Sequence, residues 1–327
     1  MAQTIAKTHK EWEKPLTELE DTIGKLREAA RKEADLDKRA GYEEKADRYQ
    51  EQAAKYVELM YANLGDWENV LVARAEKRPY TLDYIGAIFS QFTELQGDRN
   101  GFVDHAIIGG PALLDGRPVM VVGHQKGRNI QERQMRNFGM ARPEGYRKAI
   151  RLFEMADRFR LPVISFVDTP AADPGVESES RGISEAIAAS MLAMFELRVP
   201  TVAIVIGEGG SGGAIGIAVS NRVLMQKHAV YSVIPPEGCA AILWRAPERA
   251  PDAAKALQIT SESALRLGVI DEIVPEPIGA AHRNPAQAAE FVKAAIVRHL
   301  AELDTMSPAD LQAERQRKFR AMGQFGS

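Results

Sequence analysis

Thr201-Val-Ala-Ile-Val-Ile-Gly-Glu-Gly-Gly-Ser-Gly-Gly-Ala-Ile-Gly216 is the stretch that decides the fold of this chain. Its first six residues, Thr201 to Ile206, are apolar or β-branched and predict a short buried strand. Five glycines follow between Gly207 and Gly213, and the apolar run from Ala214 to Val219 predicts a buried helix. A strand that feeds a glycine loop opening a helix presents free backbone N–H groups at the positive end of the helix dipole. Such a loop is typical of a site for an anion, whether bound or developing in a reaction.

Three functional interpretations compete for this loop, beside that of an ordinary tight turn. Gly207 to Gly212 matches the dinucleotide fingerprint G-x-G-x-x-G, but residues 224–230 lack the acidic residue that should bind the ribose. Gly209 to Gly213 matches the nucleophile elbow G-x-S-x-G, and Asp271 and His282 follow in the order of a serine hydrolase triad. The third interpretation is an oxyanion hole made only of backbone amides. A tight turn needs one or two glycines, so five favour a ligand.

Length and composition narrow the class of protein. A chain of 327 residues is long enough for a full α/β core with an appendage. Its net charge of -3 argues against a protein that binds nucleic acid or membrane surfaces. Cys239 is the single cysteine, which excludes a disulfide framework and a cysteine-rich zinc site. No apolar run reaches the roughly 18 residues of a membrane span. We therefore expect a cytoplasmic protein.

Residues 1–77 differ from the rest and predict an N-terminal helical extension. They are rich in Glu, Lys, Arg and Ala, and apolar residues recur at heptad spacing. One stripe runs from Leu16 to Leu26 and another from Tyr42 to Met60, with Gly41 as the expected break. We expect two helices that pack as a hairpin or against a partner, the alternative being a solvated helical face laid on the main domain.

Residues 78–284 show strands alternating with helices and predict the main domain. A hairpin is expected to turn at Asp115-Gly116, and buried strands at 163–168, 222–225 and 230–234, with helices at 146–159 and 180–197. Repeated β-α-β units with apolar strands predict an α/β fold whose largely parallel sheet is buried on both faces. Residues 285–327 predict a C-terminal helical tail, with caps at Asn284-Pro285 and Ser307-Pro308.

A second loop, Asp168-Thr-Pro-Ala-Ala-Asp-Pro-Gly175, follows a predicted strand just as the glycine loop does. In an open α/β fold two such loops form the ligand crevice. A basic run lies upstream, usually a solvated face but also suited to a phosphate-rich ligand. Its members are Lys126, Arg128, Arg133, Arg136, Arg142, Arg147 and Lys148. The six histidines show no ligand spacing such as H-x-x-x-H, so we expect no metal site in this chain.

Several motifs together resemble one family. They are Gly123-His-Gln-Lys-Gly-Arg128, Asn137-Phe-Gly-Met140, Pro143-Glu-Gly-Tyr-Arg-Lys148, Ile206-Gly-Glu-Gly-Gly-Ser-Gly-Gly-Ala214, Pro236-Glu-Gly-Cys239, and Pro275-Glu-Pro277 followed by Gly279 to Pro285. With them the chain resembles, over nearly its whole length, the carboxyltransferase alpha subunits of the bacterial multisubunit acetyl-CoA carboxylase. The resemblance implies the crotonase-like α/β fold of repeated ββα units, with a coenzyme A site and two backbone oxyanion holes at a subunit interface.

The resemblance also implies a reaction. A carboxyl group passes from carboxybiotin, held on a separate carrier protein, to the coenzyme A thioester acetyl-CoA, which gives malonyl-CoA for fatty acid synthesis. Both anions that form are oxygen-centred, so backbone N–H groups can stabilise them. By similarity, Gly212 and Gly213 supply the hole for the biotin oxyanion. The residues expected to bind substrate are Gly209, Gly210, Ala171, Ala172, Asp173, Lys126 and Arg128.

Partners are implied as well. They are a carboxyltransferase beta subunit in an alpha2beta2 assembly, a biotin carboxyl carrier protein and a biotin carboxylase. The beta subunit is expected to supply the second oxyanion hole, most coenzyme A contacts and a zinc ribbon that this one-cysteine chain lacks.

The second loop departs from the family, which usually has Asp-Thr-Pro-Gly-Ala-Tyr-Pro-Gly there. Ala171 replaces a glycine and Asp173 replaces an aromatic ring. Because alanine resists positive φ, we expect a local change of backbone, and the carboxylate should make the pocket more polar. Acetyl-CoA stays the default substrate, with another short acyl-CoA as the alternative. Two rivals remain: an enoyl-CoA hydratase or isomerase, although Gly209 to Ile215 offers no acidic base, and a non-catalytic scaffold for the beta subunit.

Overall fold

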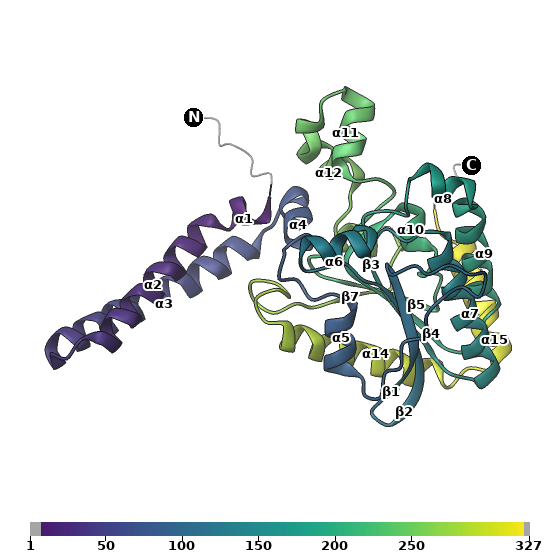
Figure 1. Cartoon of the computed structure of the whole chain (residues 1–327), viewed down its shortest axis with the longest axis horizontal. Helices are drawn as coiled ribbons and strands as arrows, with labels where there is room; N and C mark the ends of the chain where they lie inside the picture. The colour runs from purple at the N-terminus through teal and green to yellow at the C-terminus, as the bar shows by residue number, and fades with distance from the viewer. Residues whose placement is uncertain (1–7, 324–327) are drawn as a thin grey trace.

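The computed structural model describes residues 8–323 and shows a central sheet flanked by helices, with a long helical hairpin projecting from it (Figure 1). The strands are β1 (Ile107–Leu114), β2 (Arg117–His124), β3 (Val163–Thr169), β4 (Thr201–Gly210), β5 (Arg222–Gln226), β6 (Val230–Ser232) and β7 (Glu272–Val274). The helices are α1 (His9–Trp12), α2 (Lys14–Lys32), α3 (Leu36–Ala62), α4 (Asp66–Ala73), α5 (Thr81–Ile88), α6 (Ile130–Met135), α7 (Pro143–Phe159), α8 (Val176–Ser180), α9 (Ile183–Glu196), α10 (Ser211–Ile215), α11 (Pro236–Trp244), α12 (Ala250–Leu257), α13 (Ser261–Arg266), α14 (Pro285–Leu303) and α15 (Pro308–Arg320), with 3-10 turns η1 (Asn137–Gly139) and η2 (Pro247–Arg249).

The seven strands form one sheet in the order β1-β2-β3-β4-β5-β7, with β6 also paired to β4. β1 and β2 are antiparallel, and the turn between them has positive φ at Asp115 (49°) and Gly116 (80°). Positive φ at both positions is the type I′ geometry that matches the twist of a hairpin. The other pairs are parallel. The predicted hairpin and the largely parallel sheet are therefore confirmed.

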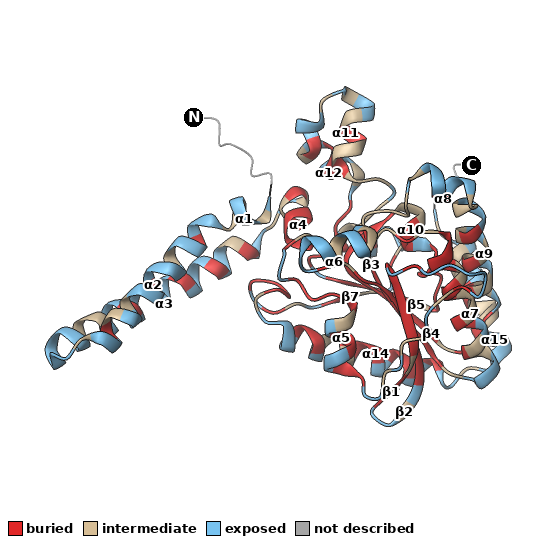
Figure 2. Ribbon diagram, viewed as in Figure 1, coloured by how far each residue is buried: buried red, intermediate tan, exposed pale blue. Residues whose placement is uncertain are grey.

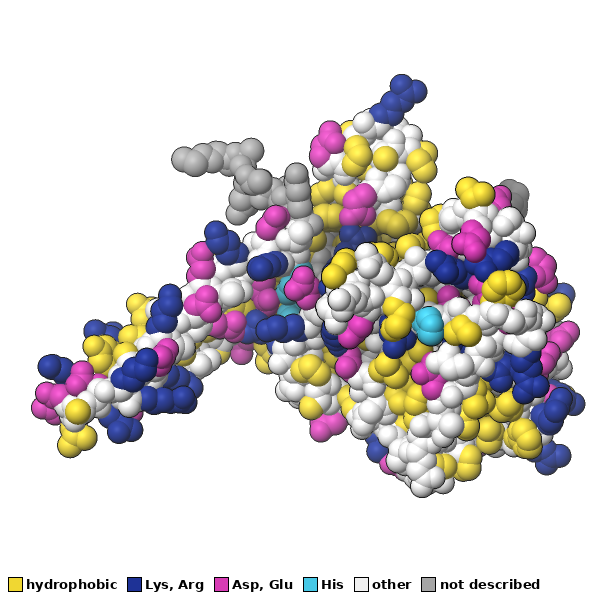
Figure 3. All heavy atoms as spheres, in the orientation of Figure 1, with side chains coloured by type: hydrophobic (Ala, Val, Ile, Leu, Met, Phe, Trp, Pro, Cys, Tyr) yellow, Lys and Arg dark blue, Asp and Glu magenta, His cyan; other side chains and the backbone are white. Residues whose placement is uncertain are grey.

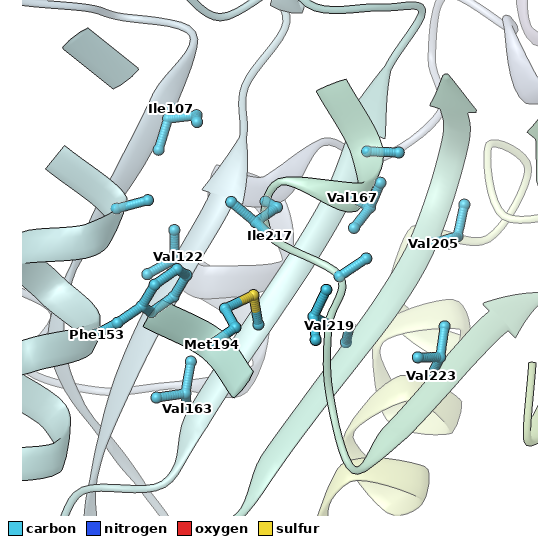
Figure 4. Close-up of a cluster of buried hydrophobic side chains, with 14 of the residues drawn as sticks. Ile107, Val122, Phe153, Val163, Val167, Met194, Val205, Ile217, Val219 and Val223 are labelled. Carbon is cyan, nitrogen blue, oxygen red and sulfur yellow. The ribbon is translucent and has the colours of Figure 1, made fainter. Parts of the chain in front are cut away.

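Helices cover both faces of the sheet. α7 and α9 pack on one face, where Phe153 and Met194 lie among the valines of the strands (Figure 4). α5 and α14 cover the other face. Successive strand residues alternate between the faces, so Val163 belongs to the first cluster and Ile164 to the second. Burial on both sides explains the uninterrupted apolar run of β4, which is buried throughout (Figure 2).

β4 is longer than its apolar run, and the helix after it is shorter than the sequence predicts. The strand continues to Gly210, and α10 ends at Ile215 rather than at Val219. The register between β3 and β4 shifts at a bulge: Val167 of β3 pairs with Val205, but Thr169 pairs with Gly209. Beyond the bulge, β4 leaves β5 and pairs with β6 through its last three residues, 208–210. These pairings hold the first glycines in extended backbone.

The helices that flank the sheet largely match the prediction. α7 begins at Pro143, three residues before the predicted start, because proline suits the first turn of a helix. The helix predicted over 180–197 is α9, which begins at residue 183 after Gly182, whose φ is 80°, and a separate short helix, α8, precedes it. In the C-terminal tail, the side chains of Asn284 and Ser307 cap α14 and α15, as predicted.

The projecting hairpin of α2 and α3, called here the arm, confirms the predicted helix pairing but not its turn. The chain reverses at residues 33–35, and Gly41 lies inside α3. Asp35 starts α3 because its carboxylate accepts from the N–H groups of Asp37 and Lys38. Leu16, Ile23 and Ala53 are buried where the two helices meet. The arm is otherwise largely exposed (Figure 2).

Two further features concern the whole chain. Within residues 8–323, every helix is too short or too polar to cross a bilayer. The division of the chain at residues 77 and 284 stays a prediction.

Candidate active site

The carboxyl ends of three neighbouring strands bring together a lysine and two carboxylates. Lys126 follows β2, Asp168 lies near the end of β3, and Glu208 is the third residue from the end of β4. The Lys126 Nζ atom lies 2.7 Å from Asp168 Oδ1 and 2.9 Å from Glu208 Oε2. Asp168 Oδ1 also accepts from the N–H of Glu208 at 3.0 Å, a backbone group at the bulge of β4. The strand order of the sheet thus builds a buried charge cluster at this edge.

Arg74, which follows α4, completes this charge cluster. Its Nε donates to Glu208 Oε1 at 2.7 Å, and its Nη1 donates to Glu237 Oε1 at 2.5 Å. Burial alone would raise the pKa of Glu208, but the positive charges of Lys126 and Arg74 outweigh it and lower this pKa to about 2. Burial alone would lower the pKa of Lys126, but Asp168 and Glu208 raise it overall. Glu208 and Lys126 therefore stay charged near neutral pH.

A cavity of about 230 Å³ opens over the charge cluster. Lys126, Arg74, Arg133 and Glu208 contribute its polar lining, and Tyr80, Phe138 and Pro170 are among its apolar walls. Phe138 belongs to η1, in which three consecutive residues have positive φ (44°, 57° and 82° at residues 137, 138 and 139). Non-glycine residues in this region cost free energy and occur often at functional sites. This turn places a half-exposed ring beside three basic groups.

The glycine loop packs directly against the second loop, and this packing requires the glycines. A Cβ on Gly210 would lie 1.9 Å from the carbonyl oxygen of Pro170. A Cβ on Gly213 would lie 2.6 Å from backbone atoms of Ala171 and Ala172. The φ of Gly213 is not in the left-handed region, so space rather than φ demands glycine there. Two predicted site loops thus touch along their backbones.

Gly212 and Gly213 lie in the first turn of α10, where N–H groups lack partners within the helix. Neither N–H makes a hydrogen bond with any residue from 8 to 323. Gly212 also lines an apolar cavity of about 500 Å³ with Ile215, Tyr231 and Val233. Ser211, which starts the helix, has a φ of 50°. The arrangement supplies two unbonded backbone donors, and the first of the two residues, Gly212, lies at an apolar hollow.

The second loop is held by its own side chains. Thr169 Oγ1 donates to the carbonyl of Ala171 at 2.6 Å. Asp173 Oδ2 accepts from Ser178 Oγ at 2.6 Å and lies 3.6 Å from Arg142 Nε. The φ of Ala171 is not positive, so an alanine fits this position without backbone strain. Strain therefore does not require the local change of backbone that we expected from the replacement of a glycine. The Asp173 carboxylate is largely satisfied within the protein.

The basic run separates into residues with different roles. Arg128 donates to the carbonyls of Glu76 and Arg78, both at 2.9 Å, and its guanidinium lies 4.0 Å above the ring of Tyr80. Lys148 is fully buried and donates to the carbonyl of Asp104. Arg133 lines the cavity beside Lys126. The basic run is therefore not one continuous surface for phosphate.

Comparison with known proteins identifies the family. A family model described as acetyl co-enzyme A carboxylase carboxyltransferase-like matches residues 9–323. The chain belongs to this carboxyltransferase family. The acetyl-coenzyme A carboxylase carboxyl transferase subunit alpha of Geobacter metallireducens is 51% identical over 316 residues, 96% of this chain and 97% of the relative. The subunit of the same name from Halorhodospira halophila is 48% identical over 320 residues, 98% of this chain and 99% of the relative.

Solved structures confirm the crotonase-like fold of this carboxyltransferase. The Pseudomonas malonate decarboxylase heterodimer matches with a TM-score of 0.58 and 18% identity, covering 73% of this chain and 95% of that one. The beta subunit of Pseudomonas aeruginosa geranyl-CoA carboxylase matches with a TM-score of 0.53 and 16% identity, covering 81% of this chain and 48% of that one. At such identities the likeness concerns the fold alone.

The structure does not assemble a serine hydrolase triad in this carboxyltransferase. Asp271 accepts from the N–H of Val223, which pairs with Ala203 near the start of β4. Ser211 lies beyond the opposite end of β4, roughly 25 Å away at the rise of an extended strand. His282 is hydrogen-bonded in another cluster, with Tyr61. The three residues follow the order of a triad along the sequence, but they do not meet in the structure.

Sequence analysis missed most of the charge cluster. Asp168 and Glu208 lie within the two loops it singled out, but it assigned neither a role. Arg74 was treated as part of the helical extension, and only tertiary packing brings it to Glu208. A signal existed for Glu208, because a lone acid within five glycines at the end of a buried strand needs a buried partner.

Proposed function

We propose that this chain is the alpha subunit of the carboxyltransferase component of acetyl-CoA carboxylase, which carboxylates acetyl-CoA to malonyl-CoA. Support comes from relatives named for that subunit, which align over nearly the whole length of both chains. The single observation that carries the site is the pair of unbonded N–H groups at Gly212, which lines an apolar hollow, and at the next residue, Gly213. Composition further supports a cytoplasmic location for this activity.

Carboxybiotin, when bound, would supply the carboxyl group as CO2, and the biotin anion left with negative charge on its ureido oxygen would accept the methyl proton of the thioester on its nitrogen. The N–H groups of Gly212 and Gly213 bind that oxygen, and the positive end of α10 adds to the stabilisation. The apolar hollow that includes Ile215 and Tyr231 excludes water from the biotin ring. Each donor of such a hole is worth about 3–4 kcal/mol of transition-state stabilisation. No side-chain acid is required.

The second loop and the charge cluster position these donors. Ala171 and Ala172 contact Gly213 along the backbone, so they fix the start of α10. Asp173 fixes the loop itself through Ser178. Arg133 presents positive charge at the cavity of about 230 Å³, where it attracts an anionic part of the substrate, and Lys126, held by Asp168 and Glu208, lies beside it in the lining. Gly209 and Gly210 keep the strand close enough to the loop for the hole to form. Arg128 contributes by holding residues 76–83 in place.

The relatives are named as alpha subunits, so we expect that this chain works with a partner subunit. We propose that a beta subunit supplies the second oxyanion hole, most coenzyme A contacts and zinc-binding cysteines, in an alpha2beta2 assembly. A biotin carboxyl carrier protein and a biotin carboxylase complete the pathway of the carboxyl group. One hole in this chain cannot serve both the biotin oxyanion and the enolate of the thioester.

The first prediction tests this dependence on a partner. The purified chain alone should show no carboxylation of free biotin from malonyl-CoA, and addition of its beta subunit should restore the reaction. Steady-state assays with acetyl-CoA and propionyl-CoA in the forward direction define the acyl preference. Robust activity from the chain alone would refute the need for a second hole.

Ser211→Ala should retain activity in the complex, and labelling of Ser211 by a fluorophosphonate would instead support a hydrolase.

A further inference from the structure

Two histidines, a glutamate and a tyrosine meet where the arm joins the body. His9 lies on α1, Glu13 lies between α1 and α2, Tyr61 lies in the last turn of α3, and His282 lies in the loop before α14. Histidine side chains are visible at this junction in the surface view (Figure 3). Neither histidine has a part in the proposed reaction. We call these four residues the junction cluster.

The distances within the junction cluster suit a metal ion. His282 Nε2 lies 3.5 Å from Glu13 Oε1, and His9 Nδ1 lies 3.8 Å from Glu13 Oε2. One ligand atom from each of His9, Glu13 and His282 can be chosen so that all three lie within 4.8 Å of one another. Ligand atoms about 2.0–2.1 Å from a tetrahedral zinc ion lie roughly 3.3–3.4 Å apart. Small rotations of the side chains would close the difference.

Surrounding contacts hold these ligands in place. Ala281 N and Arg78 Nη1 both donate to Glu276 Oε2, at 2.7 and 2.9 Å, so a buried ion pair fixes the loop that carries His282. Tyr61 Oη donates to Glu13 Oε1 at 2.9 Å and so orients this carboxylate. Orienting contacts of this kind are typical of metal sites.

One opposing charge and an open cavity adjoin the junction cluster. Arg283 donates to Glu13 Oε1 at 2.8 Å and opposes a cation, but it is also paired with Glu20. A cavity of about 710 Å³, which His9, Glu13 and His282 help to line, gives an ion and its water a route in.

We propose that the junction cluster binds a divalent transition metal of the zinc class, with His9, Glu13 and His282 as protein ligands and water as the fourth. Two histidines and one glutamate form a ligand set that zinc accepts with an open fourth position. The bound ion joins α1 and the start of the arm to the loop before α14. This proposal departs from the expectation based on ligand spacing, because the two histidines are 273 positions apart in the chain (282 − 9).

Metal titration of the full-length chain tests the proposal. Zn²⁺ is titrated into chelator-treated protein by calorimetry, and Co²⁺ serves as a spectroscopic probe of tetrahedral coordination. Wild type should bind one Zn²⁺ per chain and give a tetrahedral Co²⁺ spectrum. His282→Ala and His9→Ala should each weaken binding by at least about a hundredfold, because loss of an orienting contact alone costs 10–100-fold. His105→Ala, an exposed histidine outside the cluster, should bind like wild type.

Melting of each variant without metal first establishes that it is folded. Zn²⁺ should then raise the melting temperature of wild type and of His105→Ala, because a ligand that binds only the folded state stabilises it. Zn²⁺ should leave the melting temperature of folded His282→Ala unchanged. Equal Zn²⁺ affinity in wild type and in both cluster variants would overturn the proposal, as would an octahedral Co²⁺ spectrum or no binding to wild type.

Discussion

At the scale of single residues, backbone contact rather than side-chain chemistry governs the glycine loop. Gly207 needs to be small because a Cβ would lie 2.4 Å from Asp168 Oδ1, and Gly209 because a Cβ would meet the ring of Tyr231 at 2.7 Å. These glycines allow β4 to pass its neighbours closely after the bulge. The same closeness sets the two amides of α10 beside the second loop, so the hole depends on steric fit.

Gly213→Ala tests whether that fit matters for the reaction. The new Cβ would lie 2.6 Å from backbone atoms of Ala171 and Ala172, so the second loop or α10 must move. We expect turnover of the reconstituted complex to fall by about a hundredfold, the loss typical of one oxyanion-hole donor. The loss should be mainly in turnover, because the hole acts on charge that develops in the transition state.

Gly86→Ala is the matched control for this substitution. Gly86 lies in α5, and a Cβ there has nothing within 4 Å, so melting and turnover should be near those of wild type or slightly better. Gly213→Ala must first show partner binding and native-like melting. If such a folded, partner-bound variant retains near-normal turnover, the amide of Gly213 does not belong to the catalytic hole.

At the scale of elements, local caps explain where helices start better than apolar spacing does. The heptad stripes located the two arm helices, but Asp35 rather than Gly41 marks the turn. A glycine in a helix lowers its stability without ending it, whereas an aspartate that accepts two N–H groups fixes the first turn.

Substitutions at these two positions should therefore have opposite effects. Asp35→Ala removes the cap and should destabilise α3 by about 1 kcal/mol. Gly41→Ala meets no atom within 4 Å and should stabilise α3 by up to about 1 kcal/mol. Hydrogen exchange of the α3 amides measures both effects. Faster exchange in Gly41→Ala would mean that the chain turns at Gly41 after all.

At the scale of the whole molecule, buried charges join segments that are distant in sequence. Arg74 and Glu208 lie 134 positions apart, and Arg78 and Glu276 lie 198 positions apart. Removing one member of the fully buried Arg78–Glu276 pair leaves the other without an opposite charge, which costs about 3–5 kcal/mol. These pairs connect the region before the sheet to the carboxyl ends of its strands, next to the proposed site.

The pH dependence of stability should reflect Glu208. Its folded pKa of about 2 lies below the ordinary value of 4.5, so its stabilising contribution is full above about pH 4.5. The contribution is lost as the pH falls from 4.5 towards 2, because the unfolded state then binds the proton more readily. We expect Glu208→Gln to be about 3 kcal/mol less stable than wild type at pH 7. This difference should shrink through the same pH range.

Denaturant unfolding at several pH values measures this difference. Glu58→Gln, at an exposed position of α3, is the control and should match wild type at every pH. A constant difference between Glu208→Gln and wild type from pH 7 to 3 would show that the carboxylate of Glu208 is not held charged by Lys126 and Arg74.

The sequence alone determined the buried strand of β4, the hairpin turn at Asp115-Gly116 and the caps of α14 and α15, because each depends on neighbouring residues. Its family motifs also predicted the crotonase-like fold, which the solved structures confirm. Only the tertiary structure decided how far β4 extends, since pairing with β6 keeps its glycines in the sheet. It also decided which groups meet: Arg74 with Glu208, and His9 with His282. Long-range packing sets these contacts, and no local pattern of residues encodes them.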